Sequence, residues 1–222
     1  MASEVDICNL ALSRLGDSAT IASINPSDGS AQADHSGRFY PIARDSMLEM
    51  HSWGFATKRV ALAVLANTWP EWTYAYAAPN DALNLLAVLA PDATNDYSVG
   101  IPLAASYYGT VNTGTGIYTP QEFAAEVDAN GNDVIYTNQI DATLRYTGRI
   151  TDTTKFSPLF TDALGWLLAS YLAGPILKGD SGMSASRNCM AAFNQVMGKA
   201  TTSDANQQRN TIKQSVSWMA GR

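Results

Sequence analysis

Cysteine, histidine and charge are all scarce in this chain of 222 residues. It contains two cysteines, two histidines and only 15% charged residues. Two isolated cysteines, Cys8 and Cys189, are typical of reduced core residues in a cytosolic protein, with a disulfide between them as the alternative. His35 and His51 are sixteen residues apart and have no cysteine beside them. They therefore do not predict a metal site.

Basic residues are few as well. Fourteen Lys and Arg stand against twenty Asp and Glu, and the net charge is -6. Lys58-Arg59 is the only adjacent basic pair. A protein that grips nucleic-acid phosphates normally shows a basic stripe, whereas a mildly acidic surface lets a polyanion pass without binding.

Long hydrophobic runs are also missing. The two longest, Ala82–Ala90 and Leu164–Leu177, are expected to be too short or too interrupted to span a bilayer. The first residues, Met1–Glu4, have neither a basic region nor an apolar core. We therefore expect no secretory signal and no membrane partner.

One short motif resembles the surroundings of a nucleophilic serine. Gly179-Asp180-Ser181-Gly182 matches the segment of trypsin-type proteases, but that mechanism also needs a histidine base and a buried aspartate. Both histidines fall in a single predicted helix. We therefore interpret the motif as a turn between two helices.

A second motif resembles a calcium loop. The segment Asp128–Asp133 is rich in Asp and Asn, but Asp133 stands where the loop needs glycine and Gln139 where it needs glutamate. A hairpin turn explains the same residues better. The glycines of Gly109–Gly116 lack the Gly-Lys-Ser/Thr ending of a phosphate-binding loop.

Paired carboxylates for glycoside hydrolysis stay open, because their pairing is spatial. Asp45 and Asp81 are the best candidates for buried acids. Both are expected to cap backbone groups or to pair with an arginine such as Arg44 or Arg59. The sequence therefore nominates no catalytic residue, no cofactor-binding residue and no metal ligand.

Helical patterns occupy both ends of the chain. Ser3 and Asp6 predict a capping box, and Pro41 lies inside a helix that we expect to be kinked rather than divided. Gly174-Pro175 is expected to weaken or stop the third helix. The predicted helices run from Ser3 to Gly16, from Ala31 to Met50, from Ser157 to about Gly174, and from about Ser184 to beyond Gly198.

Strand patterns occupy the middle. Alternation predicts that Trp72, Tyr74 and Tyr76 share one buried face of a strand, and Asn130-Gly131 predicts a type I′ hairpin turn. The segment Asp92–Gly116 is expected to be a loop. The predicted strands are Arg59–Leu65, Trp72–Tyr76, Leu83–Leu89, Phe123–Val127, Val134–Tyr136 and Ala142–Tyr146.

This order of elements predicts an α+β protein. We expect an antiparallel helical bundle from the N- and C-terminal parts, an inserted antiparallel β region, and an extended C-terminal arm. The expected divisions are residues 1–54 and 151–209 for the bundle, 55–150 for the β insertion and 210–222 for the arm.

An ordered set of landmarks spans nearly the whole chain. By these landmarks it resembles the tail tubular protein A family, the head-to-tail adaptors of short-tailed bacteriophages. The set comprises Cys8–Leu12 with Leu15-Gly16, Tyr40, Arg44-Asp45, Leu48, His51–Ala56, Arg59, Tyr74–Tyr76, Pro79, Asp81, Leu144–Tyr146, Phe156, Leu164–Leu172, Ser217-Trp218 and Arg222.

The resemblance implies a structural virion protein and not an enzyme. The family forms a ring, a dodecamer, that docks under the portal protein and receives the tail nozzle protein. DNA passes through its centre without specific binding. The expected location is the head-tail junction of the virion tail, after assembly in the host bacterial cytoplasm, and no cofactor is expected.

The C-terminal arm is the expected portal anchor. A polar segment precedes an apolar tip, and the expected portal contacts are Val216, Trp218, Met219 and Arg222. The alternative for the arm is that Trp218 folds back on its own subunit. For the whole chain, the alternatives are a phage peptidoglycan hydrolase that uses an Asp/Glu pair and a host- or carbohydrate-binding module that uses surface Trp and Tyr.

Overall fold

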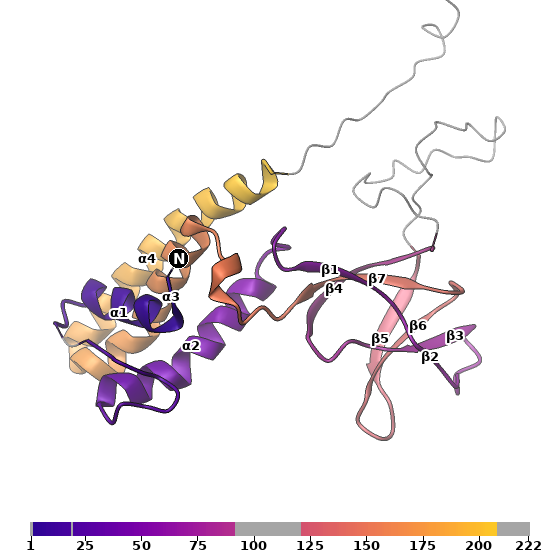
Figure 1. The fold of residues 1–222 in the computed structure, drawn as a ribbon, viewed down its shortest axis with the longest axis horizontal. Coiled ribbons are helices and arrows are strands. Elements are labelled where there is room, and N and C mark those ends of the chain that lie inside the picture. Colours follow the sequence, from indigo (N-terminus) through magenta and orange to yellow (C-terminus); the bar gives the residue numbers. More distant parts are fainter. Residues whose placement is uncertain (1, 19, 92–120, 208–222) are drawn as a thin grey trace, which may run out of the picture. The chain divides into compact units, whose positions relative to one another are not determined.

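Helices and strands occupy separate parts of this α+β chain in the computed structural model (Figure 1). The structure describes residues 2–18, 20–91 and 121–207. The chain divides into two units. The helical unit consists of Met1–Thr57 and Thr147–Gln207, and the β unit contains Lys58–Tyr146.

All four predicted helices are present in the helical unit. The capping box is confirmed, because the Asp6 amide donates to Ser3 Oγ at 3.1 Å and the Ser3 amide donates to Asp6 Oδ2 at 2.8 Å. One continuous helix runs through Pro41. The elements are α1 (Glu4–Arg14), α2 (Ala31–Glu49), the short 3-10 helix η1 (Thr153–Lys155), α3 (Pro158–Leu177) and α4 (Gly179–Ala205).

Helix α3 is the core of the helical unit, since it contacts α1, α2 and α4. Its buried residues lie on nearly every side of the helix, as expected when neighbours cover it all round. They are Phe160, Ala163, Leu164, Gly165, Leu167, Leu168, Ala169, Ser170, Leu172 and Ala173.

The expectation that no apolar run could span a bilayer needs correction for α3. This 20-residue helix meets the length and composition of a membrane span. Of that window, 56% is buried inside the protein, and the core helix of a soluble protein passes the same test. The predicted run was too short because it began at Leu164, whereas the helix begins at Pro158.

An arginine ties α1 to α3. The Arg14 guanidinium lies 4.1 Å from the centre of the Trp166 ring and donates to the Asp162 carbonyl at 2.8 Å. It also pairs with the Asp162 carboxylate. Gly165 leaves the room for this arrangement, because a Cβ there would stand 2.8 Å from Arg14 Nη1.

The segment after α2 supplies the aromatic part of the same core. Trp53 is fully buried, and its indole N–H donates to the Met47 carbonyl at 2.8 Å. The ring of Phe160 meets Trp53 at 5.0 Å, Phe55 at 5.0 Å and Phe156 at 4.7 Å between centroids. The Trp-Gly-Phe segment therefore has an architectural role.

The connection between α3 and α4 is shorter than predicted. Pro175 lies within α3, which continues to Leu177, and α4 begins at Gly179 rather than near Ser184. The prediction treated 178–182 as a turn because Gly and Asp are common there. The chain turns between the two helices at Lys178 and Gly179, which have φ angles of 56° and 53°. Gly182 is therefore not needed for the turn and lies within α4.

The β unit contains two sheets. A three-stranded sheet has the order β1-β7-β4, and a four-stranded sheet has the order β2-β3-β6-β5 with antiparallel neighbours. The strands are β1 (Thr57–Ala61), β2 (Val64–Leu65), β3 (Tyr74–Ala77), β4 (Ala82–Leu89), β5 (Phe123–Val127), β6 (Asp133–Thr137) and β7 (Thr143–Gly148).

The predicted strand Arg59–Leu65 is wrong as a single element. The chain bends at Leu62 and Ala63 and passes from one sheet to the other. The Leu62 amide donates to Ala142 at 2.9 Å, whereas the Ala63 carbonyl accepts from Ala77 at 2.9 Å. Local β propensity continues through the bend, so the change of sheet leaves no mark in the sequence pattern.

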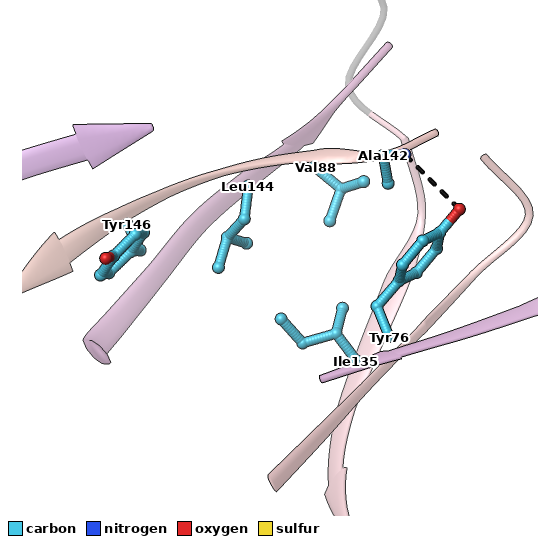
Figure 2. Close-up of a cluster of buried hydrophobic side chains, with 6 residues drawn as sticks. All are labelled: Tyr76, Val88, Ile135, Ala142, Leu144 and Tyr146. Carbon is cyan, nitrogen blue, oxygen red and sulfur yellow. Dashed lines mark hydrogen bonds between the residues drawn. The ribbon is translucent and has the colours of Figure 1, made fainter. Parts of the chain in front are cut away.

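Side chains from both sheets form one buried cluster (Figure 2). Tyr76 and Ile135 come from the four-stranded sheet and point toward Val88 and Leu144 of the three-stranded sheet, as Figure 2 shows. The Tyr76 hydroxyl donates to the Gln139 carbonyl at 2.8 Å. It thereby fixes the turn that leads from β6 to β7.

The prediction that Trp72, Tyr74 and Tyr76 share a face is wrong for Trp72. The strand begins at Tyr74, so alternation does not extend back to position 72. Trp72 packs on the opposite face, against Ala75 and its neighbours, while Tyr74 packs against the Tyr76 cluster.

The β5–β6 hairpin is confirmed, but its type I′ turn is not. Val127 pairs with Asp133, which leaves five residues between the strands. Only Gly131 has a positive φ, 84°, among the described residues of this loop. Asp128 Oδ1 accepts the amides of Asn130 and Asn132 at 2.8 Å each, and this side-chain bonding favours the longer loop.

The α3–α4 contact predicts opposite effects for two glycines of α4. A Cβ on Gly182 would stand 2.9 Å from the Ala173 carbonyl oxygen, which is backbone and cannot rotate away. We expect Gly182→Ala to lower the free energy of unfolding by about 1–3 kcal/mol. Gly198→Ala is the control, because nothing lies within 4 Å of its Cβ, and it should raise stability by up to about 1 kcal/mol. Urea unfolding followed by circular dichroism measures both; a stabilising Gly182→Ala would contradict the close contact.

The two-sheet cluster predicts that Tyr76 contributes more than Trp72 to the stability of the β unit. Tyr76 is fully buried, whereas Trp72 is half-buried. Tyr76→Ala should lower the free energy of unfolding of the β unit by about 3–5 kcal/mol, as for large aromatic side chains in cores. Trp72→Ala should cost clearly less. Hydrogen exchange of the β6 and β7 amides measures the loss, and equal costs for the two variants would show that Trp72 also belongs to a closed core.

Candidate functional site

The predicted portal contacts lie outside the described residues. Val216, Trp218, Met219 and Arg222 all fall within 208–222, and the predicted loop Asp92–Gly116 falls within 92–120. These predictions therefore stay predictions.

The serine motif belongs to a helix and not to a turn. Ser181 lies in the first turn of α4, and its hydroxyl lies 3.0 Å from the Lys178 carbonyl and 3.3 Å from the Leu177 carbonyl. Both are ordinary contacts of a helical serine to the preceding turn. His35 stacks on Phe39 within α2, at 6.5 Å between centroids, and not on this serine.

Asp45 holds two arginines. Its carboxylate accepts from Arg44 Nε at 2.9 Å and from Arg149 Nε at 2.9 Å. The predicted pairing with Arg44 is confirmed. The carboxylate is about a quarter exposed, so it is not the buried acid that was considered.

Asp81 joins the three strands of the smaller sheet. Lys58 Nζ lies 2.5 Å from its Oδ2, and the Tyr146 hydroxyl donates to its Oδ1 at 2.9 Å. Burial opposes its ionisation, but the hydrogen bonds from Lys58 and Tyr146 outweigh it and lower the pKa of Asp81. Burial and the bond to Asp81 raise the pKa of Tyr146 to about 12. A charged acid between a lysine and a neutral phenol is a structural link, and the predicted arginine partner is replaced by Lys58.

Both cysteines are buried free thiols. Burial raises the pKa of the Cys8 thiol to about 12 and also raises that of Cys189. A protonated, buried thiol is a poor nucleophile and a poor metal ligand. The prediction of two reduced core cysteines is confirmed, and the alternative disulfide is not formed.

The one His–Asp pair of the described residues was not predicted. His51 Nε2 lies 3.2 Å from Asp204 Oδ2, and the Gly54 amide donates to both Asp204 oxygens at 3.1 Å. The ring of His51 meets Trp53 edge-on at 4.8 Å. His51 lies beyond α2, which ends at Glu49 with Met50 as its C-cap, so the predicted placement of His51 within that helix is wrong. The pair anchors the last turn of α4 to the segment that leads into β1.

A cleft of about 430 Å³ lies between α2 and the segment before it. Its charged lining residues are Glu4, Asp34 and Arg44. Tyr40 also lines it. The buried Tyr40 hydroxyl has no hydrogen-bond partner, and burial raises the pKa of Tyr40. Among the described residues, no group of three His, Cys, Asp or Glu could hold a metal ion.

An exposed apolar surface lies at one edge of the four-stranded sheet. Val64 and Leu65 form β2 and are 63% and 38% exposed. Trp69 follows them and is 56% exposed. Every residue from 63 to 71 is exposed, and none from 61 to 70 is charged. We call residues 63–70 the β2 edge segment.

Asn67 fixes the backbone at the exposed tryptophan. Its side-chain amide donates to the Trp69 carbonyl at 2.9 Å and accepts the Trp69 amide at 2.9 Å. It also donates to the Trp72 carbonyl. A large aromatic on a loop with its own hydrogen bonds is a pre-organised contact, of the kind that anchors protein interfaces.

Sequence reasoning missed the β2 edge segment as a surface. It assigned part of the segment to the predicted strand Arg59–Leu65, because Val and Leu favour strands wherever they occur. The usable signal was the run of ten uncharged residues from 61 to 70, which includes Trp69-Pro70. Proline is typical of a strand edge or turn, so this stretch pointed to the outside of a sheet.

Comparison with known proteins assigns no family. No protein-family model matches the chain, and no curated protein matches it.

The His51–Asp204 pair predicts a local stability change. Asp204→Ala would leave the Gly54 amide without its acceptor in a partly buried site, which typically costs about 1–3 kcal/mol. We expect faster hydrogen exchange at the Gly54 amide and lower stability of the helical unit. Ser203→Ala, at an exposed neighbouring position, should change stability by less than about 0.5 kcal/mol. Unchanged exchange at Gly54 in Asp204→Ala would contradict the anchoring role.

Proposed function

We propose that this chain is the structural head-to-tail adaptor of a short-tailed bacteriophage. It forms a ring, dodecameric in the family that it resembles, between the portal and the tail nozzle. DNA passes through the ring. The chain catalyses no reaction and uses no cofactor, and it acts at the head-tail junction of the virion after assembly in the bacterial cytoplasm.

The observation that carries this proposal is the β2 edge segment. Val64, Leu65 and Trp69 are exposed together on a stretch without charge. Grouped exposed apolar residues mark surfaces that contact other molecules. In a symmetric ring, every copy offers such a surface to its neighbour, so no copy leaves it in water.

The order of helices and strands is compatible with the bundle, insertion and arm that the resemblance implies. We propose that the helical unit is the adaptor's antiparallel bundle, that the β unit is its insertion, and that residues 210–222 are the arm. On this proposal Val216, Trp218, Met219 and Arg222 contact the portal. The net charge of -6 favours a channel that DNA passes without adhering to it.

One observation also favours a second function. The ordered, exposed Trp69 would suit a host- or carbohydrate-binding module, in which a flat aromatic surface meets the ligand directly. In that case the protein would bind its ligand as a single copy. The ring and the module therefore differ in the state of the free protein.

Native mass and particle shape distinguish the proposals. We expect the purified chain to form rings in native mass spectrometry and electron microscopy, alone or after mixing with a portal protein, and to leave peptidoglycan intact. A single copy that binds a glycan, and loses it in Trp69→Ala, would replace the ring with the binding module. Clearing of peptidoglycan that disappears when one Asp or Glu becomes its amide would replace it with the hydrolase.

A further inference from the structure

The four-stranded sheet has two edges that differ in character. Among the described residues, β2 pairs only with β3, and β5 pairs only with β6. The outer sides of β2 and β5 therefore present backbone groups that can pair with another strand. Val64 at one edge and Val127 at the other are each 63% exposed.

The strand directions allow the two edges to join. Each neighbour in the order β2-β3-β6-β5 is antiparallel to the next, so β5 runs opposite to β2. A β5 strand from another copy, placed beside β2 so that the sheet continues, would therefore pair with it in the antiparallel sense. Antiparallel pairing is the arrangement already used throughout this sheet.

The register carries apolar rows to both edges. Residues opposite each other in a sheet point to the same face. Val64 lies opposite Tyr76, which lies opposite Ile135, which lies opposite Ala125. The other face has the equivalent row Leu65, Ala75, Tyr136 and Ala124. Joined copies would continue both rows without interruption by a charge.

Charge decides which edges meet. The β5 edge carries Glu126 and is preceded by Glu122, whereas residues 61–70 around β2 carry no charge. If two β5 strands paired about Ala124, each Glu122 would stand opposite a Glu126. Like charges directly opposite each other destabilise a sheet. The uncharged β2 edge accepts the acidic β5 edge without this repulsion.

We propose that the β2 edge segment of one copy pairs with β5 of the next copy and extends the four-stranded sheet from subunit to subunit. This inference rests on the proposed ring and names its contact. Because the two surfaces differ, the contact is head-to-tail, and repetition of such a contact closes a ring when the rotation allows it.

A stable contact between the two edges must bury more surface than the paired strands alone provide. A pair of short strands buries less than the roughly 1,200 Å² at which specific interfaces begin. Trp69, which follows β2, and Val127, the last residue of β5, are both more than half exposed and supply apolar surface to the same contact. The hydrogen bonds of Asn67 hold Trp69 ready for it.

A lysine at the edge tests the contact. Val64→Lys puts a charge into the uncharged edge, which is the way natural sheets block edge pairing. We expect the ring to fall to smaller species in native mass spectrometry while circular dichroism stays unchanged. Ile42→Lys is the matched control, since Ile42 is 55% exposed on α2, and its rings should persist. Persistence of rings in Val64→Lys, or equal loss in both variants, would overturn the edge contact.

Crosslinking tests the pairing directly and separates it from the ring itself. The single variants Val64→Cys and Val127→Cys are each expressed alone and are also co-expressed as separate chains. Each preparation is then treated with a short bis-maleimide. We expect covalent dimers only when both variants are co-expressed, because the native thiols are buried. Dimers of Val64→Cys alone would show that two β2 edges meet. Rings without crosslinks would show that the subunits meet through another contact. Either result overturns the β2–β5 contact but leaves the proposal of a ring standing. A chain that stays single with the portal present overturns both proposals.

Discussion

Burial of α3 is the constraint on which the helical unit depends. A helix that is apolar on nearly every side must be covered by neighbours, and here α1 and α2 come from the N-terminal part and α4 from the C-terminal part. The chain must therefore return to its beginning after the β strands. The Gly148 amide donates to the Ala56 carbonyl at 2.8 Å, so the outgoing and returning segments lie side by side. An insertion whose two ends meet can form a unit of its own without disturbing α3.

Features governed by neighbouring residues could be predicted from the sequence. The Ser3–Asp6 capping box needs only residues three apart, and the structure forms it. The bounds of β5 agree with the predicted Phe123–Val127, because turn residues follow it closely. The two free thiols also follow from residue type. In each case the local pattern and the final environment favour the same arrangement, which is the condition under which sequence reasoning succeeds.

Features governed by distant partners could not be predicted. Asp204 meets His51 and Gly54 from about 150 residues away, and no spacing rule connects them. Trp72 lies on the unexpected face because β3 begins two residues later than its aromatic alternation suggests. The bend at Leu62 and Ala63 depends on Ala142, just before β7 of one sheet, and on Ala77 in β3 of the other. The exposed surface was missed for a related reason: valine and leucine favour strands, but only the sheet order shows that β2 is an edge.

An open sheet edge is ordinarily a hazard, and the form of this one limits the danger. Natural sheets protect their edges with short strands, charges or proline. Here β2 has only two residues and Pro70 follows shortly after, while the acids at β5 discourage that edge from pairing with itself. Neither edge alone is a good template for unlimited growth. The two edges differ in charge but agree in direction and in their apolar rows. In the proposed ring, each edge would pair with the opposite edge of an identical chain, and closure of the ring would leave no edge unpaired. On this proposal, the short β2 strand and the acids of β5 protect a single subunit only weakly, but they make the opposite edge of another copy the favoured partner.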